Sequence, residues 1–549
     1  MIRLIECVPN FSEGRDPEVI RQITASIAAV EGVRLLNVDP GKATNRTVVT
    51  LVGDPDAVIE AAFQAIRVAG TLIDMRHHSG EHPRMGATDV CPLIPISGIT
   101  MAETVEYARR LAERVGRELN LPVYLYEAAQ PDKNRSNLAT IRAGEYEGLA
   151  QKIVKPEWRP DFGPASFDAA RGATVIGARD FLVAYNVNLN TTSTRRANAI
   201  AFDIREAGRK VKNAAGEEVS QPGTLKAVKA IGWFIAEYGI AQVSINLVDL
   251  AVTPVHVAFD EVSRAAAARG IRVTGSELVG LVPLKCLVDA GRYFLEKQQR
   301  STGVPERELV RIAVRSLGLD ELAPFHPEER VIEYLLQSDS AAPLVGMSLT
   351  NFAYETASES PAPGGGSIAA YIGALGAALG TMVANLSSHR RGWDERWKEF
   401  SDQANAGQQQ TRTLLTLVDE DTAAFTRVMT AFGLPKATDD EKAARRAAIQ
   451  EATRAATEVP FRVMETALAS MTLIKSMADT GQESSVSDAG VGALCARSAV
   501  MGAFLNVKIN AASLTDKAYA SDIVSRGAEI ERQAQALETE ILAIVNGKI

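Results

Sequence analysis

The chain has 549 residues, which is too long for one hydrophobic core, so about two to four domains are expected. Hydrophobic residues make up 46% of the chain and charged residues 23%, an ordinary composition for a soluble globular protein. The net charge is −8, and no stretch is dense in lysine and arginine. This pattern argues against a nucleic-acid partner, but it does not argue against small anionic ligands.

The cysteines and the amino-terminal segment favour a cytoplasmic protein. Cys7, Cys91, Cys286 and Cys495 are scattered and form no CxxC pair, so neither a disulfide framework nor a zinc cluster is predicted. The first residues, MIRLIECVPNFSEGRD, lack the long apolar run and the cleavage site of an export signal. We therefore expect reduced thiols and a cytoplasmic location.

Strand and helix patterns alternate over the first part of the chain, with Gly, Pro and Asp at the joints. Strands are expected at 3–10, 33–40, 46–53, 89–96 and 122–128, and helices at 16–30, 55–73 and 100–119. This alternation predicts a sheet covered by helices.

A second cycle of the same kind is expected to begin near residue 173. Its strands are predicted at 181–190, 230–249 (a pair) and 273–283, and its helices at 193–208, 254–270 and 284–298. The pattern predicts two α/β lobes, α+β sandwich-like, over residues 1–180 and 181–337. A cleft between two such lobes is a common place for a small-molecule site.

Residues 338–346, SDSAAPLVG, are expected to be a linker, and residues 347–549 an all-α helical bundle. The segment 364–389 carries no Asp, Glu, Lys or Arg and is long enough to span a bilayer. Its many Ala, Gly, Ser and Thr residues instead favour the central helix of a soluble bundle, where small residues allow close packing. We expect no membrane association.

Three of the six histidines, His77, His78 and His82, lie within the segment IDMRHHSGEHPRMGATD, residues 73–89. Loop metal ligands, a structural loop whose histidines only form hydrogen bonds, and an acid/base site are the three interpretations. Gly80 and Pro83 disfavour a regular helix, so a shaped loop is expected. Imidazole titrates near physiological pH, which favours the acid/base interpretation.

Several long motifs resemble known families. ECVPNFSEGRD, NVDPGKATNRTVVTLVGDP, HHSGEHPRMGATDVCPLIP, RPDFGP, GATVIGARDFLVAYNVNLNT and GSELVGLVP are similar to the formiminotransferase family. ESPAPGGGSIAAYIGALGAALGTMVANLS, VDEDTAAF and SDAGVGA resemble the formiminotetrahydrofolate cyclodeaminase family. In this order the two halves resemble the fused formiminotransferase-cyclodeaminase family over nearly the whole chain.

The resemblance implies two linked reactions. A formimino group passes from N-formimino-L-glutamate to N5 of tetrahydrofolate, and cyclisation to 5,10-methenyltetrahydrofolate then releases ammonia. It also implies a polyglutamylated folate substrate, no metal or redox cofactor, and a homo-oligomer.

The resemblance places the catalytic histidine of the transferase in GEHPRMG, which makes it His82. Arg84 is expected to hold a carboxylate of either substrate, with a loop ion pair as the alternative. Asp39 is expected to orient the histidine or the pterin. Folate binding carries over to the segment GPASFDAARG, for which a simple loop is the alternative. Its residues are Gly163, Pro164, Ala165, Ser166, Phe167, Asp168, Ala169, Ala170, Arg171 and Gly172.

In the helical domain, Gly364, Gly365, Gly366 and Ser367 precede a long helix. Helix N-termini bind anions, so a folate carboxylate or the pterin edge is expected there, with a plain helix cap as the alternative. From the family resemblance, Asp421 is expected to be the acid/base residue of the cyclodeaminase.

Three further residues of this domain are open candidates. Asp419 is the neighbour with which Asp421 is most easily confused, and Lys475 is a further candidate. Asp488 is expected to contact the pterin, with a helix cap as its alternative. Taken without the family, the acidic run 419–421 would be a solvated turn.

Two other functions stay open from the sequence. One keeps the fold but uses formylglutamate as the donor, with a cyclohydrolase-like helical domain. The other is a non-catalytic folate-binding scaffold.

Overall fold

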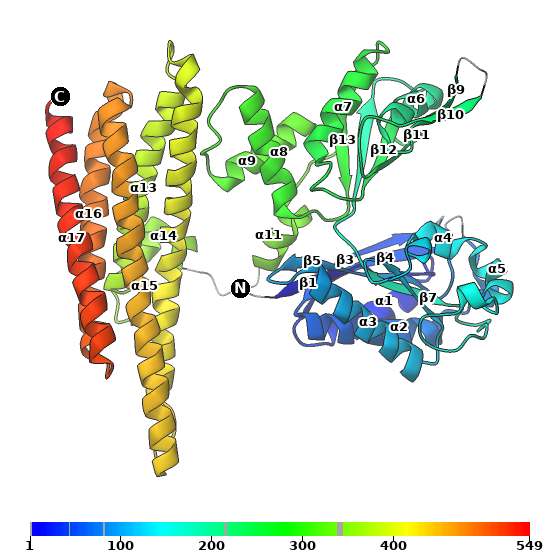
Figure 1. Cartoon of the computed structure of the whole chain (residues 1–549), viewed down its shortest axis with the longest axis horizontal. Coiled ribbons are helices and arrows are strands. Elements are labelled where there is room, and N and C mark those ends of the chain that lie inside the picture. Colours follow the sequence, from blue (N-terminus) through cyan, green and yellow to red (C-terminus); the bar gives the residue numbers. More distant parts are fainter. Residues whose placement is uncertain (1–2, 43, 81–82, 214–216, 338–343) are drawn as a thin grey trace. The chain divides into compact units, whose positions relative to one another are not determined.

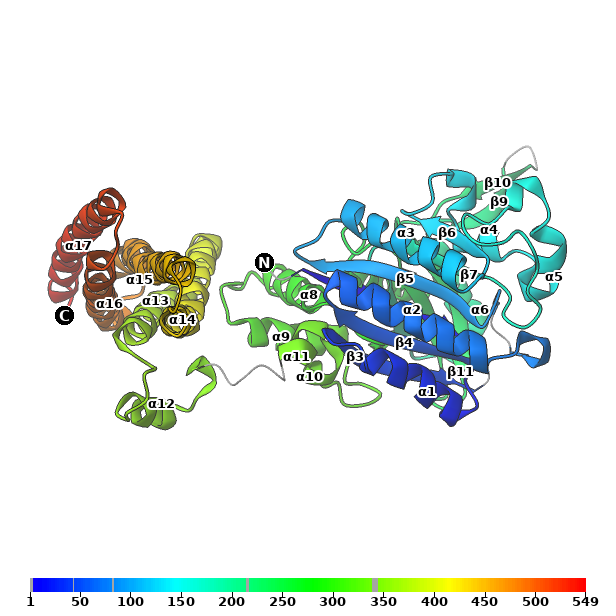
Figure 2. The same ribbon diagram turned by 90° about the horizontal axis from the view of Figure 1, so that it is seen from below.

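A computed structural model describes residues 3–42, 44–80, 83–213, 217–337 and 344–549 (Figures 1 and 2). The chain forms two compact units. The first contains Met1–Leu284 and Gly318–Leu335, and the second contains Lys285–Leu317 and Leu336–Ile549.

The first unit begins with a seven-stranded mixed sheet. Its strands are β1 (Leu4–Cys7), β2 (Asn10–Phe11), β3 (Val33–Gly41), β4 (Arg46–Gly53), β5 (Thr88–Ser97), β6 (Val123–Glu127) and β7 (Thr174–Ala178). β1 and β2 both pair with β4 and β5, β3 pairs with β4, and β5, β7 and β6 run parallel. The five predicted strands are confirmed. β7 belongs to this first sheet, so the expected start of a second cycle near residue 173 is wrong.

Three amphipathic helices pack against this sheet (Figure 2): α1 (Pro17–Ala28), α2 (Pro55–Leu72) and α3 (Met101–Glu118). Side chains of Asp16, Asp54 and Thr100 cap their first turns, and Glu103 completes a capping box with Thr100. Each cap satisfies N–H groups that the helix cannot, which explains why the predicted helices begin at these residues.

A smaller apolar cluster lies on β5, β6 and β7, against α4 (Leu138–Arg142) and α5 (Glu145–Lys152). Short 3₁₀ turns flank these elements at Met75–His77, Lys133–Arg135 and Pro156–Trp158. The helices of this cluster leave the β1–β4 end of the sheet uncovered, and the first cavity described below lies there, while the second extends toward α4.

The second lobe is a four-stranded antiparallel sheet in the order β11-β12-β8-β13. Its strands are β8 (Val183–Leu189), β11 (Val228–Ile235), β12 (Ile240–Leu247) and β13 (Val273–Val279). α6 (Thr194–Ile204) and α7 (Val255–Ala267) pack on it, and β9 (Arg209–Lys212) pairs with β10 (Glu218–Gln221) as a separate arm. α10 (Pro327–Arg330) and α11 (Ile332–Gln337) follow later in the chain.

The second unit is helical, as predicted. It holds α8 (Leu284–Lys297), α9 (Glu306–Leu317), α12 (Leu349–Thr356), α13 (Gly365–Ser388), α14 (Trp397–Phe432), α15 (Asp439–Thr480), α16 (Val486–Ala512) and α17 (Lys517–Asn546). Short 3₁₀ turns lie at Leu344–Gly346, Asp394–Arg396 and Glu483–Ser485. Of the predicted linker, residues 338–343 lie outside the described residues.

The expected central helix is α13, which packs against α14, α15 and α16. Gly366, Gly373, Gly376 and Gly380 are among its buried residues, and small residues of this kind let the helices approach closely. Among the described helices, Gly365–Ser388 and Glu483–Ala512 are long and apolar enough to cross a membrane by length and composition. The structure buries 61% and 50% of their apolar windows, which is typical of core helices in a bundle.

Candidate functional site

Two overlapping cavities lie over the uncovered part of the first sheet, and together we call them the trench. The first has a volume of about 480 Å³ and extends from β1–β4 to residues 179–184, 246 and 279–281. The second has a volume of about 590 Å³ and includes Pro83, Arg142 and Lys229. Both cavities are lined by Asn10, Arg46, Arg179, Leu182 and Asn246. Residues of both lobes therefore line one continuous space, as the two-lobe pattern predicted.

A fully buried carboxylate holds two guanidinium groups at the wall of the trench. Asp89 accepts hydrogen bonds from Arg46 and Arg142 and also from the backbone N–H of Met85, at 3.0 Å. Arg46 is fixed further by its Nε, which donates to Oδ1 of Asn10 at 3.0 Å. The single negative charge of Asp89 neutralises only one of the two guanidinium charges. Arg46, Arg142 and Asp89 together therefore carry a net positive charge at the wall of the cavity. Lys229 and Arg179 add positive charge to the second cavity, and Glu127 and Glu145 offset part of it.

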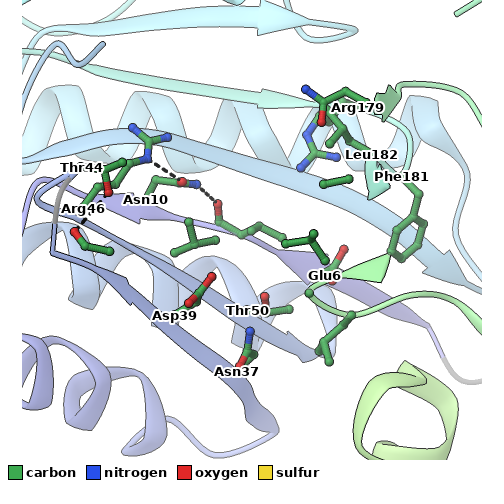
Figure 3. A pocket seen from close by; sticks show the side chains of 18 residues that line it. Glu6, Asn10, Asn37, Asp39, Thr44, Arg46, Thr50, Arg179, Phe181 and Leu182 are labelled. Carbon is green, nitrogen blue, oxygen red and sulfur yellow. Dashed lines mark hydrogen bonds between the residues drawn. The ribbon is translucent and has the colours of Figure 1, made fainter. Parts of the chain in front are cut away.

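Glu6 lines the first cavity and is only 4% exposed. Burial raises the pKa of its carboxyl to about 7, against the opposing effect of the Arg179 charge. Figure 3 shows the labelled side chains of this cavity, with Arg46 and Asn10 toward one end and Glu6 and Phe181 toward the other. Asp39, the predicted orienting residue, lies on β3 in the same cavity and is exposed.

His82 lies outside the described residues, so its catalytic role stays a prediction. Pro83, which follows it directly, lines the second cavity. His77 is exposed. His78 is half-buried; its Nε2 lies 2.8 Å from the carbonyl oxygen of Asn45, and its Nδ1 accepts from Nε of Arg84 at 3.3 Å. Burial lowers the pKa of His78, which fits a neutral structural imidazole.

Arg84 does not face the trench. Its guanidinium donates to both carboxylate oxygens of Glu147, at 2.6 and 2.9 Å, and to Glu145 at 3.2 Å. With those two glutamates it lines a third cavity of about 440 Å³, which shares Gly144 and Glu145 with the second cavity of the trench. Two carboxylates of α5 thus occupy the donors expected to hold a substrate, and the geometry corresponds to the ion-pair alternative instead.

The predicted folate segment 163–172 is an ordered loop whose polar groups are used internally. Asp168 accepts from the backbone N–H groups of Ala170 and Arg171, at 3.0 Å each, and from Nε of Arg171. Gly172 has a φ of +71° and packs against the carbonyl of Met85. Phe167 lies 5.5 Å from the Tyr146 ring. None of the ten residues lines the trench, so the structure does not bring this segment to Glu6 or Arg46.

The first turn of α13 meets Asp421 of α14 in the second unit. The hydroxyl of Ser367 donates to Oδ2 of Asp421 at 2.9 Å. A Cβ on Gly366 would lie 2.2 Å from Oδ1 of Asp421, so only glycine allows this approach. Gly364 is the N-cap of α13, and a Cβ on Gly365 would lie 3.6 Å from Nδ2 of Asn506. Burial raises the pKa of Asp421, while the hydrogen bonds from Ser367 lower it.

The structure separates Asp421 from the other candidates. Asp419 accepts from the backbone N–H of Leu344 at 2.7 Å and anchors the turn before α12. Lys475 forms an ion pair with Glu540. Asp488 lies in the first turn of α16, eighteen residues before Asn506, which corresponds to about 27 Å along a helix. Within one chain, Asp488 is therefore not brought to the Asp421 site.

Sequence reasoning missed Glu6, Asp89 and the two arginines that Asp89 holds. A signal was present, because Glu6 and Asp89 are charged residues inside apolar strand patterns, where a carboxylate needs a partner or a function. Over the described ranges, no group of three or more His, Cys, Asp or Glu side chains is placed to hold a metal ion.

Comparison with known proteins gives three family matches in chain order. The "Formiminotransferase domain, N-terminal subdomain" matches residues 4–179, and the "Formiminotransferase domain" matches 184–337. The family "Formiminotransferase-cyclodeaminase" matches residues 348–529.

Similar curated proteins carry related names. The formimidoyltransferase-cyclodeaminase of Mus musculus is 43% identical over 549 residues and is covered, like this chain, to 100%. The glutamate formimidoyltransferase of Streptococcus pyogenes is 42% identical over 296 residues, which are 54% of this chain and 94% of that protein. The methenyltetrahydrofolate cyclohydrolase of Methylorubrum extorquens is 39% identical over 193 residues, 35% of this chain and 93% of that protein.

Proposed function

The chain belongs to the formimidoyltransferase-cyclodeaminase family, and we propose that the trench of its first unit is the transferase site. The protein is a bifunctional enzyme. It transfers the formimino group of N-formimino-L-glutamate to tetrahydrofolate, and it cyclises 5-formiminotetrahydrofolate to 5,10-methenyltetrahydrofolate with release of ammonia.

The observation that carries this proposal is the cationic wall made by Arg46 and Arg142 on Asp89. Formiminoglutamate carries two carboxylates, and guanidinium groups bind carboxylates through paired hydrogen bonds. Asp89 fixes both arginines before the substrate arrives, so little side-chain entropy is lost on binding. Lys229 and Arg179 line the same cavity and supply further positive charge.

His82 is the proposed proton carrier of the transfer step. N5 of tetrahydrofolate bonds to the formimino carbon, and the bond from that carbon to the glutamate nitrogen breaks. The proton lost by N5 passes to the imidazole and then to the departing nitrogen, so one group serves as base and as acid. The neighbouring Pro83 lines the cavity that holds the arginines, which supports this assignment.

Asp421 is the proposed acid/base residue of the cyclodeaminase. N10 attacks the formimino carbon and loses a proton, and the leaving ammonia gains one. A carboxyl whose pKa is raised by burial is better matched to this exchange than an exposed aspartate. Its position at the glycine-rich start of α13 also supports a folate contact there.

Paired assays test this division of labour. His82→Ala is expected to lower formimino transfer by about 10²–10⁴-fold and to leave ammonia release from supplied 5-formiminotetrahydrofolate unchanged. Asp421→Asn is expected to do the reverse. His77→Ala, in the same loop, and Glu420→Gln, beside Asp421, are the matched controls. Loss of both activities in either folded variant contradicts the division.

We also propose that the enzyme is a homo-oligomer. α13 and α16, which pack on each other, expose large apolar side chains at helical spacing: Leu375, Met382, Leu386, Val491, Leu494, Leu505 and Ile509. A patch of this kind is typical of a surface that another copy covers. Sedimentation equilibrium is expected to give a multiple of the 58.8 kDa chain mass, and a monomer at micromolar concentration contradicts the proposal.

Two further proposals concern the setting of the enzyme. The folate is polyglutamylated, and Lys210 and Lys212 of the β9 arm are candidate contacts for its tail. The sulfur atoms of Cys7 and Cys91 lie 3.4 Å apart as free thiols, which supports a cytoplasmic location, where thiols stay reduced.

A further inference from the structure

We propose that Glu6 is the carboxylate that recognises the pterin ring of tetrahydrofolate, by accepting hydrogen bonds from its 2-amino group and its N3–H. This inference rests on the proposed function of the trench and adds a residue and a ligand edge to it. The two pterin donors point in the same direction, as those of a guanidinium do, and they match the two oxygens of one carboxylate.

The strand places the Glu6 side chain in the cavity. Its neighbours Ile5 and Cys7 are fully buried in the core beneath the helices, so the alternation of side chains along β1 directs Glu6 to the opposite face. In the sheet, Glu6 is opposite Val52 of β4 and Ile94 of β5. The carboxyl is thus at the floor of the trench, held by strands on both sides.

The Glu6 carboxylate has no hydrogen-bond partner among the described side chains and backbone groups. No described residue donates a hydrogen bond to it, although the side chain is only 4% exposed. The charged groups that act on it are Arg179 after β7 and Glu333 of α11, and Arg46 and Asp39 line the same cavity. A buried carboxyl without donors is costly, and a ligand that brings two N–H groups removes that cost.

The register of the sheet relates Glu6 to the transfer chemistry. β5 carries Ile94 opposite Glu6 and Val90 opposite Asn10, and the strand advances about 13 Å between them. Val90 and Pro83 line the second cavity. N5 belongs to the ring of the pterin that is farther from the 2-amino edge. A pterin that is anchored at Glu6 and extends along the strands toward Asn10 brings N5 closer to the arginine-lined cavity, where the formimino donor is proposed to bind.

The test combines one substitution with one change in the ligand. In transfer assays, Glu6→Gln is expected to raise the KM for tetrahydrofolate by about 10- to 100-fold, the effect of losing hydrogen bonds to a charged group. The 2-desamino-2-methyl analogue, which lacks the 2-amino donor, is expected to inhibit wild type and Glu6→Gln with Ki values within about threefold of each other. Glu106→Gln, an exposed carboxyl on α3, is the matched control and is expected to leave both constants unchanged.

Proton release provides a second readout. The carboxyl of Glu6 has a pKa of about 7 in the empty cavity and must be ionised to accept both donors, so binding at pH 7 is expected to release about half a proton. Calorimetry in two buffers of different ionisation enthalpy measures this release, and Glu6→Gln is expected to abolish it. Cyclodeaminase activity on supplied 5-formiminotetrahydrofolate should remain, because its site lies in the second unit, and an unchanged far-UV circular dichroism spectrum shows that the first unit of the variant is folded.

The outcomes separate the two proposals. An equal loss for tetrahydrofolate and for the 2-desamino analogue, or no loss for either, overturns the assignment of Glu6 and leaves the trench as the transferase site. Unchanged transfer by His82→Ala overturns the proposed function, whatever Glu6 does.

Discussion

Burial raises the pKa of several carboxyl groups: Glu6, Glu127 and Asp180 in the first unit, and Asp419 and Asp421 in the second. Glu6 and Asp421 are the two to which we assign functional roles. Neither Glu6 nor Asp421 has a cation within ion-pairing distance among the described residues. Asp89, in contrast, forms ion pairs with both Arg46 and Arg142. A buried carboxyl of this kind destabilises the fold when it ionises and is typical of functional sites.

The pKa of Glu6 predicts a pH-dependent cost in stability. Its folded value of about 7 is above the ordinary 4.5, so the native state binds the proton more tightly than the unfolded chain does. The contribution of Glu6 to stability is therefore complete below pH 4.5 and is lost as pH rises through 7, by about 3 kcal/mol at most. Glu6→Gln is expected to unfold at a higher temperature than wild type at pH 8, and the difference should shrink toward pH 5. A variant less stable than wild type at pH 8 contradicts this.

At the residue scale, the sequence predicted individual functional residues better than it predicted which residues they contact in the fold. The family resemblance selected Asp421 from an acidic run, and the structure places it against Ser367. Asp89 is 43 residues from Arg46 and 53 from Arg142, so no local pattern reveals their cluster. Of the two roles left open for Arg84, the structure shows the ion pair, with glutamate partners that lie more than 60 residues away in the sequence.

The start of α13 shows how one element creates a site. The helix begins directly after Gly364, and the missing side chain of Gly366 lets Asp421 of α14 reach the first turn. Asp421 accepts the Ser367 hydroxyl there and lies at the positive end of the helix dipole. The conformation of the first turn of α13 and the position of the Asp421 carboxylate therefore depend on each other.

Gly366→Ala tests this arrangement. The added Cβ would lie 2.2 Å from Oδ1 of Asp421, so the carboxylate must move. Cyclodeaminase activity is expected to fall at least about tenfold, and stability by about 1–3 kcal/mol, while formimino transfer is retained. Gly148→Ala in α5 is the control, because its Cβ would meet nothing within 4 Å. Full cyclodeaminase activity in Gly366→Ala contradicts the proposed role of this contact.

At the element scale, periodicity predicted most helices and strands, because their apolar faces are regular. β7 was assigned to the wrong cycle, since strand order in a sheet depends on pairings far apart in the sequence. The helix predicted at 193–208 ends at Ile204, and Arg209, Lys210 and Lys212 follow it in β9, whose residues pair with β10.

For the whole molecule, the family boundaries and the compact units differ in one segment. Residues 184–337 match one family, yet α8 and α9 pack with the helical unit. Their connecting loop is buried there: the backbone N–H of Thr302 donates to Ser401 at 3.1 Å, and the amide of Asn385 donates to the carbonyl of Gly303 at 2.8 Å. The pattern of strands and helices along the chain predicted the domains 1–180, 181–337 and 347–549. That pattern does not show which unit α8 and α9 pack against.

The central claim is that the trench is the transferase site, and a crystal structure of the protein with tetrahydrofolate tests it most directly. We predict that the pterin lies in the first cavity with its 2-amino edge at Glu6, and that its N5 faces the side chain of His82 beside the arginine-lined cavity. A pterin bound outside the trench, with the imidazole of His82 turned to bulk water, would contradict the claim.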